Sequence, residues 1–347
     1  MRPARRSTWR RKSAATPGNI SSRCWPRAAR SGGRSRRRSR RLLLDMNTIE
    51  GPEIQPDDFA FVYLDVDNPT VAWLAYRGVL NSPDIKTANP GNLSWFLVDV
   101  LRRGLASTIR REGLLEGFRD KHFPNAVPRL RCVYAYPTLE AAQKGDYGRG
   151  KFRKENLVAI GPGTIDPMIE TYDSNWITDF DSLTIDAAKK YWAGEKTKDP
   201  HPELLLSGRF WIFGTSVRKR AYETIKAVWP NALALLELSR LAVDFDSDFG
   251  TISPWLVQED RRIVVKHIIR YDEQEGLEIL KEAIERSKID TRYQVNWADL
   301  EPLRAPSENK EADERFRVPD TSVYDHEFRS DKLDELNHFV QFVFNQH

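Results

Sequence analysis

Alternating apolar and polar residues predict strands at several places along the chain. Residues 59–66 (FAFVYLDV) and 71–80 (VAWLAYRGVL) are rich in aromatic and β-branched side chains, which suit the pleated surface of a sheet. We expect these two strands to be joined through the turn residues 67–70 (DNPT). Similar runs predict strands or extended segments at 129–136, 156–162, 169–181, 203–214 and 261–270.

Apolar residues at spacings of three and four predict helices between these strands. Residues 93–123 read as one broken helix or two consecutive helices. A short helix is expected after Thr138, whose hydroxyl suits an N-cap, and another at 182–194, capped by Asp181 or Ser182 and ended by Gly194. Further helices are predicted at 216–241 (a pair), 273–287 and 330–347. Short strands interleaved with helices predict an α+β fold.

The character of the chain changes after Asp244, where the segment DFDSDFG marks a predicted boundary. We therefore expect a main domain at 46–245 and a small strand–helix module at 250–300. The polar, proline-containing segment 301–329 reads as a linker. Residues 330–347 read as an amphipathic helix that docks on a domain surface.

The positive charge of the chain comes from its first 45 residues. Residues 1–44 contain fourteen Arg, one Lys and no acid, whereas the 39 basic and 49 acidic residues from Met46 onward give a formal charge of −10. The leader is expected to be disordered. It reads as a stretch upstream of a true start at Met46, as a basic arm that binds nucleic acid, or as a targeting peptide.

Several classes of protein and site receive no support from the sequence. No run of about 18 apolar residues predicts a membrane span, and two cysteines, Cys24 and Cys132, fit a reducing cytoplasm. The histidines are scattered singly, so no metal site is expected. There is no phosphate loop and no nucleophile elbow, and the glycines of IGPGT (160–164) read as a turn rather than as a dinucleotide fingerprint.

Two charged residues occupy unusual positions in apolar segments. Arg77 follows WLAY in a predicted strand, where a guanidinium is either paired structurally or holds a phosphate. Glu203 opens the strand ELLL, where it either faces water or has a buried partner. Other residues have structural interpretations. Cys132 is expected as a small buried side chain, and Tyr191 and Trp192 are expected in the core face of a helix. Asp173 is expected in an Asx turn or in contact with a polar ligand.

Four segments resemble the ADP-ribosyltransferase-like fold, and in particular a family of uncharacterised bacterial domains assigned to it. They are YRGVL (76–80), HFPNAVPRLRCVYAYPTLEAA (122–142), YDSNW (172–176) and YWAG with PHPELLLSG (191–208). The resemblance covers roughly residues 59–245. It implies a split sheet, mixed or antiparallel, with flanking helices and a small C-terminal α/β appendage.

The resemblance also implies a site for NAD+. Arg77 would bind the pyrophosphate or ribose, and Tyr134 or Tyr136 would contact the nicotinamide end. Asp173 and Trp176 of the YDSNW segment would complete the NAD+ contacts. Glu203 would accept a hydrogen bond from the nicotinamide ribose and stabilise the oxocarbenium-like charge as nicotinamide leaves.

The chain departs from the patterns of that fold at three places. Cys132 stands where a serine is expected in the Arg-Ser-Glu pattern, and an arginine rather than a histidine precedes the aromatic pattern. His201 lies two residues before Glu203, where transferases that modify arginine place an acid. Arginine is therefore not the expected acceptor.

Three functions are compatible with the sequence. The first is a mono-ADP-ribosyltransferase or NAD+ glycohydrolase that acts as a toxin or defence effector. It is expected in the cytoplasm, with a protein or nucleic acid as acceptor and without contact to a membrane. It predicts that Arg77, a tyrosine of 129–136 and Glu203 converge. The second is a catalytically silent binding module of the same fold, and the third is a nucleic-acid-associated protein that works through the basic arm.

Overall fold

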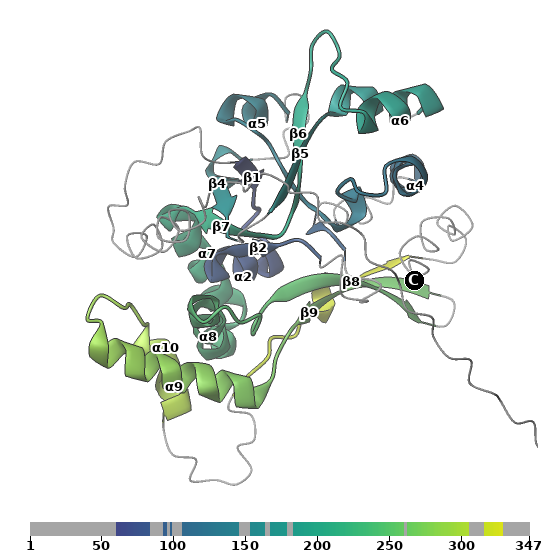
Figure 1. Cartoon of the computed structure of the whole chain (residues 1–347). Coiled ribbons are helices and arrows are strands. Elements are labelled where there is room, and N and C mark those ends of the chain that lie inside the picture. Colours follow the sequence, from purple (N-terminus) through teal and green to yellow (C-terminus); the bar gives the residue numbers. More distant parts are fainter. Residues whose placement is uncertain are drawn as a thin grey trace, which may run out of the picture.

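The computed structural model describes residues 60–83, 93–95, 98, 106–145, 153–163, 167–178, 183–259, 262–304 and 316–328. The predicted leader and the predicted C-terminal helix at 330–347 lie outside these ranges. Helices and antiparallel strands alternate along the described chain (Figure 1), which confirms the α+β class.

The first sheet has four strands in the order β1-β4-β7-β2, namely β1 (Ala60–Tyr63), β4 (Leu157–Pro162), β7 (Arg209–Phe213) and β2 (Val79–Asn81). Its ladders are antiparallel, with Ile160 opposite Ile212 and Val79 opposite Trp211. The central strands β4 and β7 carry the apolar residues that the sequence pattern predicted.

The second sheet has the order β3-β6-β5, with β3 (Val133–Ala135), β6 (Pro202–Ser207) and β5 (Met168–Asp173). Gly208, at a positive φ of 127°, connects β6 to β7 and so joins the two sheets. Phe61 and Tyr136 form a bridge between them as well. A third sheet, β10-β9-β8, combines β8 (Ile252–Glu259), β9 (Arg262–Ile269) and β10 (His326–Phe328). All of these ladders are antiparallel.

The predicted strand at 71–80 is wrong, because residues 69–77 form helix α2 (Pro69–Arg77). Asn68 caps this helix by accepting hydrogen bonds from the backbone and hydroxyl of Thr70, and proline stands in its first turn, where no amide donor is needed. Gly78, at φ 85°, ends the helix through its N–H bond to Leu74. The helix is buried on most of its surface, so its sequence lacks the polar face that identifies a helix.

The remaining helices agree with the prediction more closely. They are α4 (Ala106–His122), α5 (Leu139–Gly145), α6 (Ile185–Trp192), α7 (Thr215–Val228), α8 (Leu233–Asp244) and α9 (Glu273–Ile289), and the structure adds a further helix, α10 (Trp297–Arg304). Thr138 caps α5 as predicted, with its Oγ1 accepting from Ala141 N at 3.0 Å. The cap of α6 is Thr184 rather than Asp181 or Ser182, because Thr184 Oγ1 accepts from Ala187 N at 3.1 Å.

Three elements were not predicted: β8, α10 and β10. Strand β10 falls inside the segment read as a linker, and it pairs with β9 from His326 to Phe328. Its three residues are too few to show an alternation, which is why the sequence pattern missed it.

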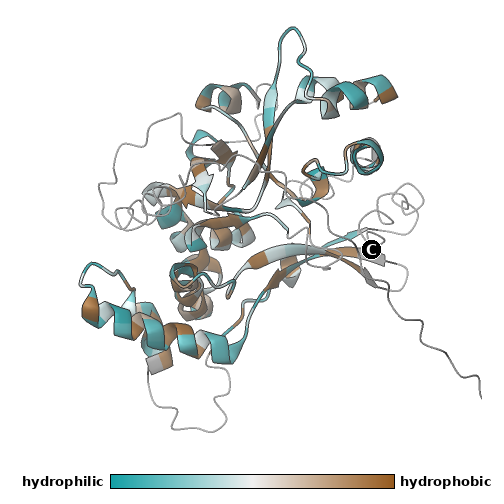
Figure 2. Ribbon diagram, viewed as in Figure 1, coloured by the Kyte–Doolittle hydropathy of each residue, from teal (hydrophilic) through white to brown (hydrophobic). Residues whose placement is uncertain are grey.

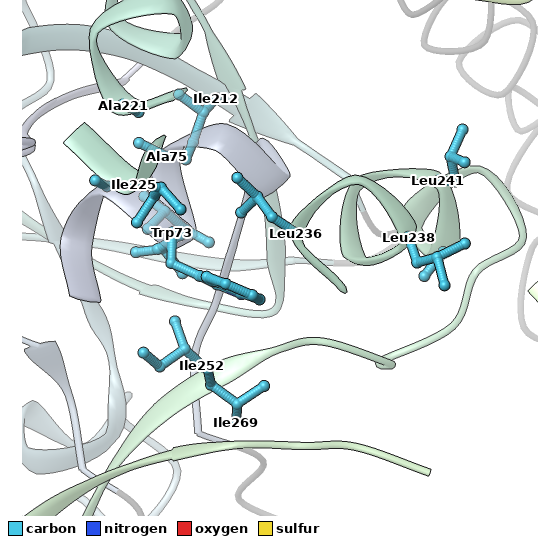
Figure 3. Packing of buried hydrophobic residues seen from close by; sticks show 14 of the residues in the cluster. Trp73, Ala75, Ile212, Ala221, Ile225, Leu236, Leu238, Leu241, Ile252 and Ile269 are labelled. Atoms are coloured by element: carbon cyan, nitrogen blue, oxygen red, sulfur yellow. The ribbon is translucent and has the colours of Figure 1, made fainter. Parts of the chain in front are cut away.

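The main hydrophobic core continues across the predicted boundary at 245–250. Trp73 of α2 is fully buried and donates from Nε1 to the carbonyl of Gly250 at 2.8 Å. Figure 3 shows its ring near Ile225 and Leu236, with Ile252 and Ile269 of the third sheet beside it. Side chains from both sides of the boundary therefore share one core.

A second apolar cluster lies between the β3-β6-β5 sheet and helices α4 and α6. Figure 2 shows apolar residues along the buried strands and α8, and hydrophilic residues on the outer faces of α6 and α9. Within the described chain, the helices are all too short or too polar to cross a membrane.

Candidate functional site around Glu203

Helices α4 and α6 cover one face of the second sheet (Figure 1), and the Glu203 side chain contacts Tyr191 of α6 on that face. It stands opposite Tyr172 of β5, and two residues later Leu205 stands opposite Tyr134 of β3. Because directly paired residues and every second residue share a face, these four side chains point the same way. The Glu203 side chain is only 15% exposed. It is therefore not a fully solvated acid at a strand entry.

One oxygen of Glu203 is held by two donors and the other oxygen is not. Oε1 accepts hydrogen bonds from Arg129 Nη1 at 2.5 Å and from the hydroxyl of Tyr191 at 2.6 Å. Oε2 receives no hydrogen bond from the residues that the structure describes, and it is not among their buried unpaired atoms. Within the described residues, the carboxylate is thus held at Oε1 and has no hydrogen-bond partner at Oε2.

Arg129 is at the centre of this cluster and is itself buried, at 2% exposure. It belongs to η2 (Arg129–Arg131), a 3-10 helix of one turn, and its Nε donates to Glu112 Oε2 at 2.8 Å. Its guanidinium lies 5.0 Å from the ring centroid of Tyr134 and 5.2 Å from that of Tyr191. Burial acts to lower the pKa of Arg129, but Glu112 and Glu203 outweigh it and raise that pKa further. Arg129 is a permanent cation.

The groups around Arg129 have defined protonation states. Burial acts to raise the pKa of Glu112, but Arg129 and Arg111 outweigh it, so the pKa is lowered and the group is ionised. Arg111 Nη2 contacts the same carboxylate at 3.0 Å. Burial raises the pKa of Tyr191 well above its usual value, and the neighbouring Glu203 raises it further. Tyr191 therefore keeps its proton, and its hydroxyl donates a hydrogen bond to Glu203.

The structure does not bring Arg77 into this cluster. Arg77 is the last residue of α2, where its Nη2 donates to the carbonyl of Ser247 at 2.8 Å. Burial lowers its pKa to about 10, and the charges that act on this pKa include Asp248 and Arg209. Arg209 begins β7 of the first sheet, whereas Glu203 lies in β6 of the second sheet. Among the described residues, the structure thus shows no contact between Arg77 and Glu203, and Arg129 is the basic residue that contacts Glu203.

The two tyrosines considered for the second position have different surroundings. Tyr134 faces Arg129 and lies on the Glu203 side of the sheet. Tyr136 bridges to Phe61 through its backbone, and its ring packs edge-on against Tyr63 at 6.3 Å. Of the two, Tyr134 belongs to the cluster.

Asp173 and Trp176 hold the chain segment that leads into β6. The two Asp173 oxygens accept from the amides of Asn175, Thr197 and His201 and from the Thr197 hydroxyl, over 2.7–3.1 Å. With two bonds to each oxygen, its acceptor positions are filled. Trp176 Nε1 donates to the carbonyl of Glu195 at 2.8 Å. Both side chains therefore hold the 194–201 segment in the described structure.

Cys132 is buried, and burial raises the pKa of its thiol well above the usual value. A neutral buried thiol is a poor nucleophile, in agreement with its interpretation as a small core residue. No group of three or more His, Cys, Asp or Glu able to hold a metal ion occurs in the part of the chain that the structure describes.

Sequence reasoning missed Arg129, Tyr191 and Glu112. Tyr191 was interpreted as helix core, and it is fully buried, but its hydroxyl has a specific partner. Glu112 and Arg129 are 17 residues apart, so no local spacing connects them. The available signal was that Glu112, Glu116 and Arg119 share one helix face with Leu115, since charged residues on an apolar face need buried partners.

The comparison with family models gives one match, to a family described as "Protein of unknown function (DUF2441)", over residues 84–221. This segment contains α4, η2, β3, α6 and β6, and hence every residue of the Glu203 cluster. The chain has no match among the curated proteins.

Proposed function

We propose that the chain cleaves the bond between nicotinamide and ribose in NAD+, as a mono-ADP-ribosyltransferase or NAD+ glycohydrolase. The observation that supports this function is the state of Glu203, whose Oε1 is held by Arg129 and Tyr191 while Oε2 is open. A carboxylate fixed in advance stabilises a developing positive charge without having to reorganise during the reaction. NAD+ as the substrate follows from the resemblance of segments 122–142 and 191–208.

In the proposed reaction the bond from ribose C1′ to the nicotinamide nitrogen breaks. Its electron pair leaves with the nicotinamide, whose ring becomes neutral, and the ribose becomes an oxocarbenium-like cation. Glu203 Oε2 would accept a hydrogen bond from a ribose hydroxyl and stabilise this cation, while Tyr134 would contact the nicotinamide end. An acceptor oxygen or nitrogen then bonds to C1′ and releases a proton to solvent. Water as acceptor gives ADP-ribose.

The proposal differs from the sequence-based expectation in its basic residue. Arg77 has no part in it, because the described contacts of its guanidinium do not include Glu203, which is paired with Arg129 instead. Asp173 and Trp176 support the site by holding the segment before β6, rather than by binding NAD+. We also propose a cytoplasmic location, since Cys132 is a buried free thiol and the sequence contains only one other cysteine.

The test compares the full-length chain with Glu203→Gln, using NAD+ labelled on the adenylate phosphate. Nicotinamide release and transfer of the label to protein and nucleic acid are both followed. Glu170→Gln is the matched control, because Glu170 faces the same side of the sheet from β5 and also accepts from a tyrosine, Tyr172, at 2.7 Å. We expect release by the wild type and by Glu170→Gln, and a loss of at least about 100-fold in Glu203→Gln. Absence of release in the wild type, or equal release by all three proteins, contradicts the proposal.

A second candidate is a binding module of the same fold without catalysis. It is favoured by the ion pair between Glu203 and Arg129, since a carboxylate whose charge is already balanced by a guanidinium stabilises a new cation less strongly. This candidate predicts that calorimetry detects NAD+ binding in both the wild type and Glu203→Gln while nicotinamide release is absent from both.

A further inference from the structure

We infer that Arg129 and Tyr191 are positioning residues that orient Glu203 for the reaction, and that Glu112 of α4 orients Arg129 in turn. This inference rests on the proposed function, since it assigns the purpose of the contacts to NAD+ cleavage. The four residues come from α4, η2, α6 and β6. Each link is a hydrogen bond between side chains.

The geometry restricts Glu203 to one orientation. Arg129 Nη1 and the Tyr191 hydroxyl reach the same oxygen, Oε1, at 2.5 and 2.6 Å, and Arg129 Nη1 also donates to the Tyr191 oxygen. The Tyr191 hydroxyl therefore accepts from Arg129 and donates to Glu203. Rotation of the carboxylate would break both bonds to Oε1, so Oε2 stays directed away from them.

Glu112 fixes the other end of the guanidinium. Its two oxygens accept from Arg129 Nε at 2.8 Å and from Nη2 at 3.4 Å, on the opposite edge from Nη1. A planar guanidinium held along two edges has little freedom to tilt. The position of α4 is thus transmitted to Glu203 through one rigid group.

Strand β5 and helix α4 provide controls that have the same side-chain chemistry but no hydrogen bond to Glu203. Tyr172 stacks on Tyr191 with centroids 4.8 Å apart, but its hydroxyl donates to Glu170. Arg119 is a second buried arginine of the same region, and its Nε donates to Glu116 at 2.7 Å. Tyr172→Phe removes a hydroxyl and Arg119→Lys replaces a buried guanidinium by an amine. Both should perturb the packing to a similar degree as the matching changes at Tyr191 and Arg129, and both leave the Glu203 contacts in place.

The kinetic test measures nicotinamide release from NAD+ by the full chain and four variants. A positioning role predicts that Tyr191→Phe lowers kcat about 10-fold and that Arg129→Lys lowers it about 100-fold, each with KM within about twofold of wild type. Tyr172→Phe and Arg119→Lys are expected to stay within about twofold in kcat. Equal losses in the variants and their controls, or losses confined to KM, overturn the inference.

A second readout does not depend on activity. In nitrogen-15 spectra of the arginine side chains, the Nη protons of Arg129 are expected as separate, slowly exchanging signals that shift in Glu203→Gln, whereas the Nε signal shifts in Glu112→Gln. Averaged Nη signals in the wild type overturn the inferred geometry. A second outcome is a wild type that shows the separate, slowly exchanging Nη signals of Arg129 and yet releases no nicotinamide. This result would contradict both the proposed function and the catalytic purpose of these contacts. Unchanged kcat in Tyr191→Phe and Arg129→Lys contradicts the positioning roles alone.

Discussion

Glu112 and Arg129 form an ion pair that is almost closed to solvent, with side-chain exposures of 0% and 2% and a distance of 2.8 Å from Nε to Oε2. Removing one partner of such a pair leaves a buried charge without compensation, which costs about 3–5 kcal/mol. One turn further along α4, Glu116 is also buried, but its environment raises its pKa, whereas that of Glu112 is lowered. Burial raises the pKa of Glu116, and the opposing influence of Arg119 does not overcome it.

The two acids therefore predict different costs for the same substitution. Glu112→Gln should lower the free energy of unfolding by about 3 kcal/mol, because Arg129 loses its bidentate partner. Glu116→Gln should cost less than about 1 kcal/mol, since burial already disfavours the charged form of Glu116 and raises its pKa. Urea unfolding at pH 7, followed by tryptophan fluorescence, measures both values. Equal costs would show that burial alone decides the stability of this helix face.

The Glu112 pair also predicts a sensitivity to acid. The pKa of Glu112 is lowered from 4.5 in the folded chain, so the unfolded chain binds the proton more readily. Its contribution to stability is complete at pH values above 4.5 and is lost as the pH falls through the lower, folded-state pKa. The difference in unfolding free energy between wild type and Glu112→Gln should thus be constant from pH 7 to about pH 5.5 and shrink below pH 4.5.

Comparing this difference at several pH values cancels the titration of the other acids, which the two proteins share. Urea unfolding at half-unit steps from pH 3.5 to pH 7 provides the curve. A difference that grows as the pH falls would reverse the sign expected from a lowered pKa, and the interpretation of Glu112 as a stabilised anion would then be wrong.

How far the sequence predicts this fold depends on whether a segment is buried on one face or on several. Helices with one polar face, such as α7 and α9, were predicted closely. Helix α2 was predicted as a strand because Ala72, Trp73, Leu74 and Ala75 are consecutive buried residues. Such a run shows neither the 3.6-residue period of a helix nor the two-residue period of a strand. Its caps, Asn68 with Pro69 at the start and Gly78 at the end, were the better evidence.

The candidate site shows the same limit. Glu203 was noticed because a carboxylate among leucines either faces water or needs a partner, and its role came from the resemblance. The structure gives it two partners. The identity of those partners depends on α4, η2 and α6 meeting over one sheet face. Their separations along the chain, 74 residues for Arg129 and 12 for Tyr191, follow no local pattern. Arg77 was chosen for its apolar neighbours, which instead reflect its place in the buried helix α2.

Gly250 and Gly194 form a matched pair for testing close packing. Their φ angles are 70° and 71°, so alanine meets the same backbone strain at both, about 1–2 kcal/mol. A Cβ at Gly250 would lie 2.1 Å from Ser239 Cβ and 2.8 Å from its Cα, whereas a Cβ at Gly194 meets no atom within 4 Å. Gly194→Ala should therefore cost about 1 kcal/mol, and Gly250→Ala about 3 kcal/mol or more.

The Gly250 substitution has a second expected effect. The carbonyl of Gly250 accepts from Trp73 Nε1, so movement of this backbone should shift the tryptophan emission or the Nε1 proton resonance in the folded state. Thermal unfolding of both variants measures the stability part. Equal losses at the two glycines would mean that the α8 backbone at Ser239 yields to the added methyl group.

Asp173 gives the last prediction, which concerns the segment leading into the site. Burial acts to raise its pKa, but hydrogen bonds from Thr197, His201 and Asn175 outweigh it and hold the pKa low. Asp173→Asn would place an amide NH2 against donors at one of the two oxygen positions and remove the charge from the other. Bonds to charged groups contribute about 1.5–3 kcal/mol each, so a loss of about 3 kcal/mol is expected.

The effect should be localised where the carboxylate acts. Amide hydrogen exchange is expected to accelerate at Thr197 and His201, whose N–H groups donate to Asp173, while the amides of β7 keep their protection. Asp199→Asn is the control, because it changes an exposed acid of the same segment and should leave these rates unchanged. Pro202 and Glu203 directly follow His201. Faster exchange at Thr197 and His201, together with a lower rate of nicotinamide release, would therefore connect the order of this segment to the candidate site. Unchanged exchange in Asp173→Asn would mean that the Trp176 contact to Glu195 is sufficient to hold the segment.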